Sequence, residues 1–179
     1  MSWYYQNKRN LPWRKTKNPY YIWISEVILQ QTTIKQGIPY YKKFISQYPK
    51  LKSLAETKEE NVLKLWQGLG YYSRARNLHF TSKLIVRKYN GIFPSSYDEL
   101  IKLKGIGDYT ASAIGSIAFN LPLAAVDGNI FRFFSRFFGI KKSIDNYKSL
   151  KYFKKKSYEL MYKENPGDYN QALMEFGSS

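Results

Sequence analysis

The sequence contains no cysteine and only one histidine, His79. Without cysteine there can be no disulfide, no thiol nucleophile and no thiolate-ligated cluster, and one histidine cannot form a histidine-rich metal site. Long apolar runs are also lacking, because the stretch SAIGSIAFNLPLAAV is interrupted by Asn120 and Pro122. The opening MSWYYQNKRN has no apolar signal core. These absences predict a soluble, cytoplasmic protein.

Acidic residues are scarce as well. The 179 residues include 29 Lys and Arg against 13 Asp and Glu, which gives a net charge of +16. Such an excess favours a polyanionic partner, with nucleic acid as the first candidate. A basic surface that serves only solubility is the alternative, and a membrane surface is disfavoured because the lysines are not confined to one amphipathic helix. With 44% hydrophobic residues, the chain can bury a core of one large domain or two small ones.

The apolar residues repeat with helical periodicity throughout, and no segment alternates as a strand would. We therefore predict an all-α protein of about nine or ten short helices. A capping box of Thr57 and Glu60 is expected to begin one helix, and Asn90-Gly91 is expected to end another. The helices are expected at 20–33, 38–48, 57–66, 73–89, 96–102, 108–118, 129–138, 147–164 and 168–176.

Residues 103–114, LKGIGDYTASAI, have the layout of a helix–hairpin–helix. Gly105 and Gly107 can adopt backbone conformations closed to other residues, and their amides can approach a phosphate. Ile106 is expected to plug between the two helices. Asp108 is expected to cap the second helix, whose dipole also favours an anion. Such a turn grips the DNA backbone without reading sequence; a plain tight turn between helices is the alternative.

Two carboxylates have surroundings that suit glycosidic cleavage. Glu26 lies mid-helix with apolar neighbours such as Trp23 and Leu29 on its own face, which raises its pKa and suits a general acid. Asp127 follows an apolar run in AAVDGNIFR. Cleavage of a glycosidic bond needs one carboxylic acid that protonates the leaving group and a second carboxylate that faces the developing cation. A surface glutamate and an ordinary N-cap aspartate remain alternative interpretations, because periodicity does not bring the two together.

Six motifs resemble, in order and spacing, the adenine DNA glycosylases of the MutY type, members of the helix–hairpin–helix superfamily that includes endonuclease III. They are LPWR, SEVILQQT, LWQGLGYYSRARNL, LKGIGDYTASAI, VDGNIFR and NQALMEFG. The resemblance implies a two-lobed all-α fold and removal of adenine mispaired with 8-oxoguanine or guanine, after the base is flipped into a pocket. The implied lobes are a six-helix barrel at 14–126, with the helix–hairpin–helix at about 97–118, and a second lobe of 1–13 plus 127–179.

The resemblance also implies roles for individual residues. Glu26 would protonate the departing adenine, and Asp127, oriented by Asn129, would stabilise the oxocarbenium-like sugar. Tyr109 stands where bifunctional relatives carry a lysine. Because tyrosine cannot form a Schiff base, we expect base release without efficient strand cleavage.

Other matches concern the grip on DNA and the adenine pocket. Gln31 and Tyr71 would be wedged into the duplex, whereas Arg74 and Arg76 either face phosphate or pack locally, and His79 is expected to be structural. The implied DNA-binding residues are Gln31, Tyr71, Gly105, Ile106, Gly107, Thr110, Arg74 and Arg76. The implied adenine-pocket residues are Trp13, Arg14, Leu29 and Glu175.

The chain departs from the family pattern after MEFG. Relatives normally continue with four cysteines that hold an iron–sulfur cluster, and with a later domain that recognises 8-oxoguanine. Because this chain has neither, we expect it to bind no cofactor. It is expected to be either a truncated protein or a reduced, cluster-free form of the family. We expect a monomer that binds double-stranded DNA with adenine opposite 8-oxoguanine or guanine, in the cytoplasm and associated with the nucleoid. A thymine glycosylase for G:T mismatches and an inactive DNA-binding module are the alternatives; SEVILQQT and the two intact carboxylates argue against them.

Overall fold

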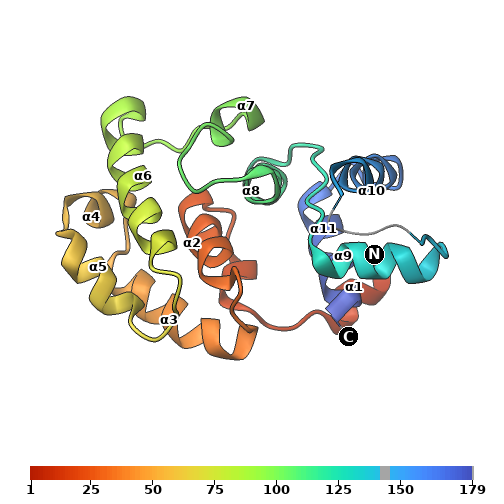
Figure 1. Cartoon of the computed structure of the whole chain (residues 1–179), viewed down its shortest axis with the longest axis horizontal. Helices are drawn as coiled ribbons and strands as arrows, with labels where there is room; N and C mark the ends of the chain where they lie inside the picture. Colours follow the sequence, from red (N-terminus) through yellow and green to blue (C-terminus); the bar gives the residue numbers. More distant parts are fainter. Residues whose placement is uncertain (142–145, 179) are drawn as a thin grey trace.

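The computed structural model describes residues 1–141 and 146–178, and every regular element within them is a helix, as predicted. Figure 1 shows two lobes, one built from α2 to α8 and the other from α1, α9, α10 and α11. Within the same residues, no helix has the length and apolar character needed to span a membrane. The helices are α1 (Ser2–Asn7), η1 (a 3-10 helix, Pro12–Lys15), α2 (Pro19–Leu29), α3 (Ile34–Gln47), α4 (Leu51–Glu56), α5 (Glu59–Trp66), α6 (Ser73–Tyr89), α7 (Tyr97–Leu100), α8 (Asp108–Phe119), α9 (Gly128–Phe137), α10 (Tyr147–Glu159) and α11 (Pro166–Ser178).

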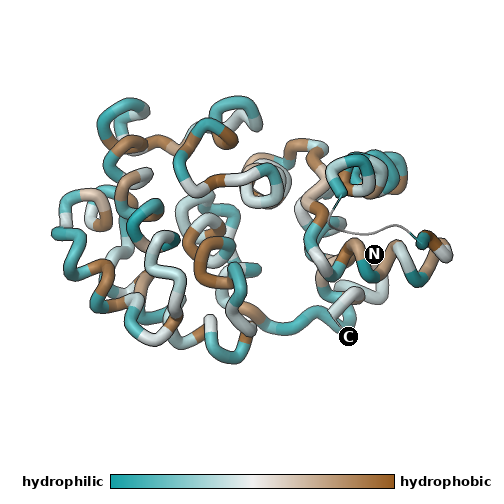
Figure 2. The backbone as a smooth tube through the Cα atoms, viewed as in Figure 1, coloured by the Kyte–Doolittle hydropathy of each residue, from teal (hydrophilic) through white to brown (hydrophobic). Residues whose placement is uncertain are grey.

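Helix α2 forms the centre of the larger lobe. Asn18 caps its start by accepting a hydrogen bond from the backbone N–H of Tyr20, and Pro19 occupies its first position. The helix is apolar on nearly all sides, so it must be covered by protein. It packs against α3, α6 and α8, and Figure 2 shows hydrophobic residues along it. This central position holds Glu26 on a rigid, enclosed element.

The second lobe has smaller hydrophobic clusters of its own. One contains Val126, Ile130, Phe134 and Phe153, which join α9 to α10. Helix α11 packs against both α8 and α9, so it links the two lobes.

Close backbone contacts explain the glycines near the ends of α11. A Cβ at Gly167 would lie 2.8 Å from the carbonyl oxygen of Ser116, and a Cβ at Gly177 would lie 2.3 Å from that of Asn129. Both distances are too short for any side chain. Glycine therefore lets α11 approach α8 at one end and the start of α9 at the other.

The helical prediction is confirmed most closely for α6 and fails around α4. Helix α6 spans the expected residues and ends at Tyr89, followed by the C-cap Asn90, whose backbone is left-handed with φ of 52°. Helix α4 was not expected. Its C-cap is Thr57, and α5 then begins at Glu59 without a side-chain cap. The predicted capping box of Thr57 and Glu60 is therefore wrong.

The turn between α7 and α8 requires glycine at one of its two positions. Gly105 has φ of +81°, and a Cβ there would lie 2.8 Å from Cβ of Asn77. Gly107 is extended and exposed, and a Cβ there would meet only open space. Ile106 is 4% exposed and belongs to the main core, as expected of a plug. Gly107 thus leaves its backbone open to an approaching molecule.

The role predicted for Asp108 is wrong. The N-cap of α8 is Gly107, and Asp108 is the first helical residue. Its carboxylate accepts hydrogen bonds from the Tyr97 hydroxyl at 2.6 Å and from Nζ of Lys154 at 2.5 Å. Because Lys154 lies on α10, this carboxylate joins the hairpin to the second lobe.

Candidate active site

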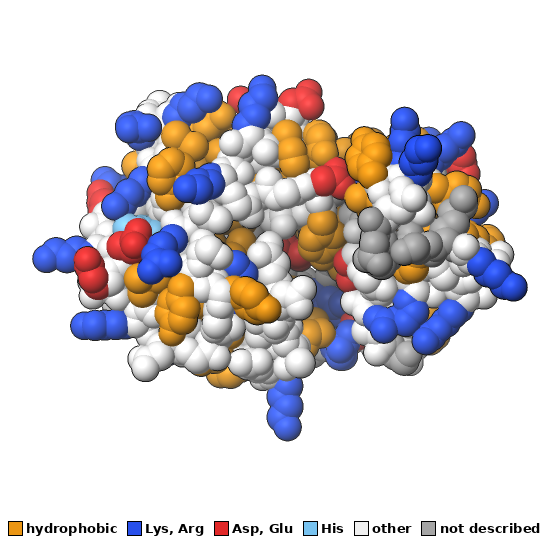
Figure 3. All heavy atoms as spheres, in the orientation of Figure 1, with side chains coloured by type: hydrophobic (Ala, Val, Ile, Leu, Met, Phe, Trp, Pro, Cys, Tyr) orange, Lys and Arg blue, Asp and Glu red, His pale blue; other side chains and the backbone are white. Residues whose placement is uncertain are grey.

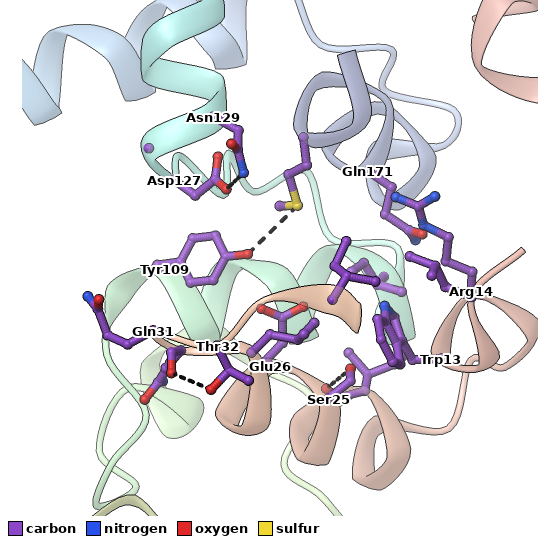
Figure 4. Close-up of a pocket in the computed structure, with 18 residues that line it drawn as sticks. Trp13, Arg14, Ser25, Glu26, Gln31, Thr32, Tyr109, Asp127, Asn129 and Gln171 are labelled. Carbon is purple, nitrogen blue, oxygen red and sulfur yellow. Dashed lines mark hydrogen bonds between the residues drawn. The ribbon is translucent and has the colours of Figure 1, made fainter. Parts of the chain in front are cut away.

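A cavity of about 410 Å³ lies between the two lobes. Its volume is in the range of small-molecule sites. Figure 3 shows a hollow between the lobes and basic side chains spread around this face. In the close-up of Figure 4, side chains from α2, α8 and the start of α9 converge on the cavity. The predicted site residues that line it are Trp13, Arg14, Glu26, Leu29, Gln31, Tyr109, Asp127 and Asn129.

Glu26 projects from α2 into this cavity (Figure 4). Burial raises its pKa to about 7; a hydrogen bond from Tyr109 lowers this pKa in part, and the charge of Asp127 adds to the rise. A carboxyl group with this pKa is protonated in about half of the molecules at neutral pH. Glu26 can therefore act as a general acid there.

Asp127 is the N-cap of α9, and both of its carboxylate oxygens are engaged. Oδ1 accepts the backbone N–H of Ile130 at 2.8 Å, and Oδ2 accepts Nδ2 of Asn129 at 2.8 Å. Burial raises the pKa of Asp127, and these hydrogen bonds limit the rise. The carboxylate is held in one orientation at the cavity, on the side opposite Glu26 (Figure 4).

Tyr109 lines the cavity from the first turn of α8. Burial, together with the nearby charges of Glu26 and Asp127, raises the pKa of its hydroxyl well above the ordinary value. The hydroxyl oxygen lies 3.7 Å from Sδ of Met174. Tyr109 therefore stays neutral at physiological pH and has no amine that could react with a sugar.

Two of the residues predicted to enter the duplex have left-handed backbones although neither is glycine. Gln31 has φ of 56° and Tyr71 has φ of 46°. Gln31 is exposed and lines the cavity, whereas Tyr71 is 69% exposed on the turn before α6. Such conformations cost energy and are retained where the surroundings impose them.

The structure corrects the position of Glu175. This residue is 4% exposed and is not part of the cavity wall. Its carboxylate accepts hydrogen bonds from Nε of Arg9 at 2.6 Å and from Nη2 of Arg14 at 2.7 Å. Burial opposes its ionisation, but the hydrogen bonds from Arg9 and Arg14 outweigh this and lower its pKa to about 2. Glu175 therefore holds Arg14, which does line the cavity.

Two residues that were predicted to contact DNA have buried side chains. Thr110 is 2% exposed, and Arg74 is 9% exposed with its guanidinium bonded to backbone carbonyls of the protein. The side chain of Thr110 is therefore not presented to DNA, and of the two interpretations of Arg74, local packing is the one that the structure shows. Arg76 is exposed and lies 3.6 Å from Glu59. His79 is buried with Nε2 at 2.9 Å from the carbonyl oxygen of Thr57, as expected of a structural residue.

Helix α11 contributes two cavity residues that sequence reasoning missed. Gln171 and Met174 line the cavity, and the Tyr4 hydroxyl donates to Oε1 of Gln171 at 3.2 Å. Both lie in the motif NQALMEFG and are three residues apart, the spacing of one helix face. That spacing is the signal that could have identified them.

The residues present do not fit an iron–sulfur cluster. The chain has no cysteine to supply thiolates. Across residues 1–141 and 146–178, no group of three or more His, Asp and Glu residues could hold a metal ion.

Comparisons with known proteins find relatives in sequence and in fold. The model of the HhH-GPD superfamily base excision DNA repair protein matches residues 24–158. A protein from Buchnera aphidicola subsp. Baizongia pistaciae, named adenine DNA glycosylase, is 45% identical over 99% of this chain. The chain spans about half the length of the curated relatives it matches, 50% in this case.

Solved structures show the same fold. A thermostable thymine-DNA glycosylase aligns with a TM-score of 0.89 and 27% identity, over 99% of this chain and 82% of that one. A non-covalent complex of endonuclease III with DNA aligns with a TM-score of 0.81 and 24% identity, over 98% of this chain and 79% of that one. The second likeness bears on the fold alone.

Proposed function

Because the chain belongs to the HhH-GPD superfamily of base excision DNA repair proteins, we propose that it removes adenine mispaired with 8-oxoguanine or guanine. The reaction is hydrolysis of the N-glycosidic bond. The observation that carries this proposal is the pairing of Glu26 and Asp127 on one cavity, with a pKa of about 7 for Glu26. The name of the Buchnera relative, adenine DNA glycosylase, supports adenine as the base.

Three of the residues that line the cavity have distinct roles in this reaction. Glu26 donates its proton to a ring nitrogen of the extruded adenine, because an adenine anion is a poor leaving group. The C1′–N9 bond then breaks, and its electron pair leaves with the protonated base. Asp127 faces the cationic sugar, whose charge it stabilises until water bonds to C1′ and loses its proton. Asn129 keeps the Asp127 carboxylate in place.

The reaction leaves the DNA strand intact. Strand cleavage by a bifunctional glycosylase proceeds through a Schiff base, which needs an amine at the sugar. Tyr109 supplies only a hydroxyl that stays protonated. The products are free adenine and an abasic site.

DNA is bound through contacts other than those of Glu26 and Asp127. The exposed backbone at Gly105 and Gly107 and the N-terminus of α8 take a phosphate. Gln31 and Tyr71 enter the duplex beside the adenine. The extruded base is held by the cavity residues Trp13, Arg14 and Leu29. Arg76 remains a candidate for phosphate contact.

We also propose how the chain is divided and where it acts. The boundaries are a barrel lobe at 14–126 and a second lobe of 1–13 plus 127–179. Apart from Leu11 and Trp13, the buried residues of the main core run from Tyr20 to Ala125, and together with the separate cluster around Phe134 they support this division. The protein acts as a monomer on double-stranded DNA in the cytoplasm, associated with the nucleoid. Its net charge of +16 supports a polyanionic partner.

A panel of duplexes tests the proposal. Single-turnover base release is measured on adenine opposite 8-oxoguanine, guanine and cytosine, and on thymine opposite guanine. We expect adenine release opposite 8-oxoguanine and guanine. Thymine release is the second candidate, favoured by the likeness to the thymine-DNA glycosylase. Release of thymine without adenine would replace the proposed function with that one.

A further inference from the structure

Arg74 is a buried cation whose hydrogen bonds go to backbone carbonyls from two separate segments. It lies at the second position of α6 and is 9% exposed. Nη1 donates to the carbonyls of Val27 and Ile28, each at 3.0 Å, and also to that of Gln30. Nη2 donates to the carbonyls of Leu69 and Gly70, each at 3.2 Å. One guanidinium thus connects the end of α2 to the turn before α6.

The contacts with α2 fit the chemistry of a helix C-terminus. The last carbonyls of a helix have no partner within the helix and carry partial negative charge. Arg74 supplies donors to two of them, at Val27 and Ile28. A planar guanidinium with five N–H donors can serve several acceptors at once, which a lysine ammonium cannot do in the same geometry.

The other segment, the turn before α6, is held by hydrogen bonds from both Trp66 and Arg74. Gly70 accepts a hydrogen bond from Nε1 of Trp66 at 3.0 Å as well as one from Arg74. The guanidinium also lies over the ring of Trp66, with 5.2 Å to its centroid, and 5.8 Å from that of Tyr71. The turn is therefore packed directly on the buried cation.

Each segment carries one of the left-handed, non-glycine residues. Gln31 follows Gln30, whose carbonyl Arg74 binds, and Tyr71 follows Gly70, whose carbonyl it also binds. Left-handed backbones at such residues cost energy and persist only when neighbouring contacts impose them. Arg74 supplies these contacts on both sides at once.

We propose that Arg74 is a positioning residue that holds Tyr71 at a fixed place relative to Gln31, which lines the cavity, so that both enter the duplex together. It contacts no DNA itself. This inference rests on the proposed function, because the pair matters only when a base is extruded. According to this inference, the strained backbones of Gln31 and Tyr71 are both stabilised by the side chain of Arg74. The sequence motifs that contain Gln31 and Tyr71 do not by themselves identify this role.

The test compares Arg74→Lys with Arg87→Lys, a matched control on the exposed end of α6. Adenine release is measured on a duplex with an A:G pair and on a duplex in which the adenine is an unpaired bulge. Extrusion costs less when a base is already unpaired. We expect Arg74→Lys to slow release about tenfold on the paired substrate and about twofold or less on the bulge. Arg87→Lys should match the wild type on both.

Amide hydrogen exchange of the full chain provides a readout that does not depend on activity. We expect exchange in residues 30–33 and 69–72 to become at least about tenfold faster in Arg74→Lys than in Arg87→Lys. Unchanged exchange in either segment, or equal slowing of release on the two substrates, would overturn the proposal. If the wild type releases no adenine, the proposed function fails, and the exchange result alone decides the positioning role.

A second variant covers the case in which Arg74→Lys does not fold. Gly70→Ala keeps the buried cation and strains only the turn, because a Cβ there meets no atom within 4 Å while φ is +70°. We expect the same greater loss on the paired substrate than on the bulge. An equal loss on both would again contradict a role in presenting Gln31 and Tyr71.

Discussion

Nδ2 of Asn129 donates a hydrogen bond of 2.8 Å to Oδ2 of Asp127, two residues earlier in the chain. The orientation of this amide is itself fixed, because its oxygen accepts a hydrogen bond from Arg132 at 2.7 Å. The other oxygen of Asp127 accepts the backbone N–H of Ile130. The carboxylate can therefore face a developing positive charge without first reorienting, which is how preorganised groups lower a barrier.

Replacing Asn129 should slow adenine release without abolishing it. Asn129→Ala removes one hydrogen bond to an ionised group, and such bonds contribute about 1.5–3 kcal/mol. We expect the single-turnover rate to fall about tenfold to a hundredfold, with little change in DNA affinity. Asn61→Ala, on the exposed side of α5, is the control. An unchanged rate in Asn129→Ala would show that Asp127 needs no such support.

The rate of base release should follow the titration of Glu26. Its pKa is about 7, and the protonated form is the active one, so the rate is expected to fall about tenfold per pH unit above that value. The raised pKa of Glu26 should also be visible in the pH dependence of the free energy of unfolding. Burial disfavours the charged form of Glu26 in the folded protein. This lowers the free energy of unfolding by an amount that is zero below the ordinary pKa of 4.5 and that grows as the pH rises toward 7. The unfolding free energy of Glu26→Gln should therefore exceed that of the wild type increasingly over this interval. A rate profile that is flat between pH 6 and 9 would contradict the role of acid.

Tyr109→Lys should introduce covalent chemistry. The wild type is expected to leave abasic sites that break only on treatment with alkali. A lysine at this position places an amine beside the sugar, where it can form a Schiff base. We expect a protein–DNA adduct that is trapped by borohydride in the variant and not in the wild type. An adduct with the wild type would mean that another amine reaches the sugar.

Loss of Glu175 should destabilise the protein at neutral pH. Glu175→Ala leaves Arg14 without its carboxylate partner, and breaking a buried pair costs about 3–5 kcal/mol of unfolding free energy. The stabilising effect of Glu175 is present above its ordinary pKa of 4.5 and is lost as the pH falls toward about 2. Urea unfolding at pH 7 and pH 3 measures both effects. Glu159→Ala, which removes an exposed pair with Lys155, should change stability by less than about 1 kcal/mol.

Local signals in the sequence predict the helices well where the ends carry clear caps. Helix α6 was predicted to its last residue because Asn90-Gly91 is a strong stop signal. Helix α4 has six residues, no acidic residue in its first turn and no basic residue in its last, so its pattern did not stand out. Asp108 looked like an N-cap locally, but its partner Lys154 lies far along the chain.

The meeting of the two carboxylates at one cavity was predictable for a different reason. Glu26, Asp127 and Tyr109 lie in motifs with a family order, and the structure brings all three to one cavity. The failures at Arg74, Thr110 and Glu175 share one cause, since each is a polar side chain whose burial depends on segments distant in sequence. Neither periodicity nor motif position carries that information.

The proposed chemistry is that Glu26 protonates the base and Asp127 stabilises the sugar cation in the same cavity. Its most direct test is single-turnover release of adenine opposite 8-oxoguanine by the wild type, Glu26→Gln and Asp127→Asn. We expect release by the wild type and a loss of at least about a thousandfold in each variant, with DNA binding retained. Release by either variant at the wild-type rate would contradict the account.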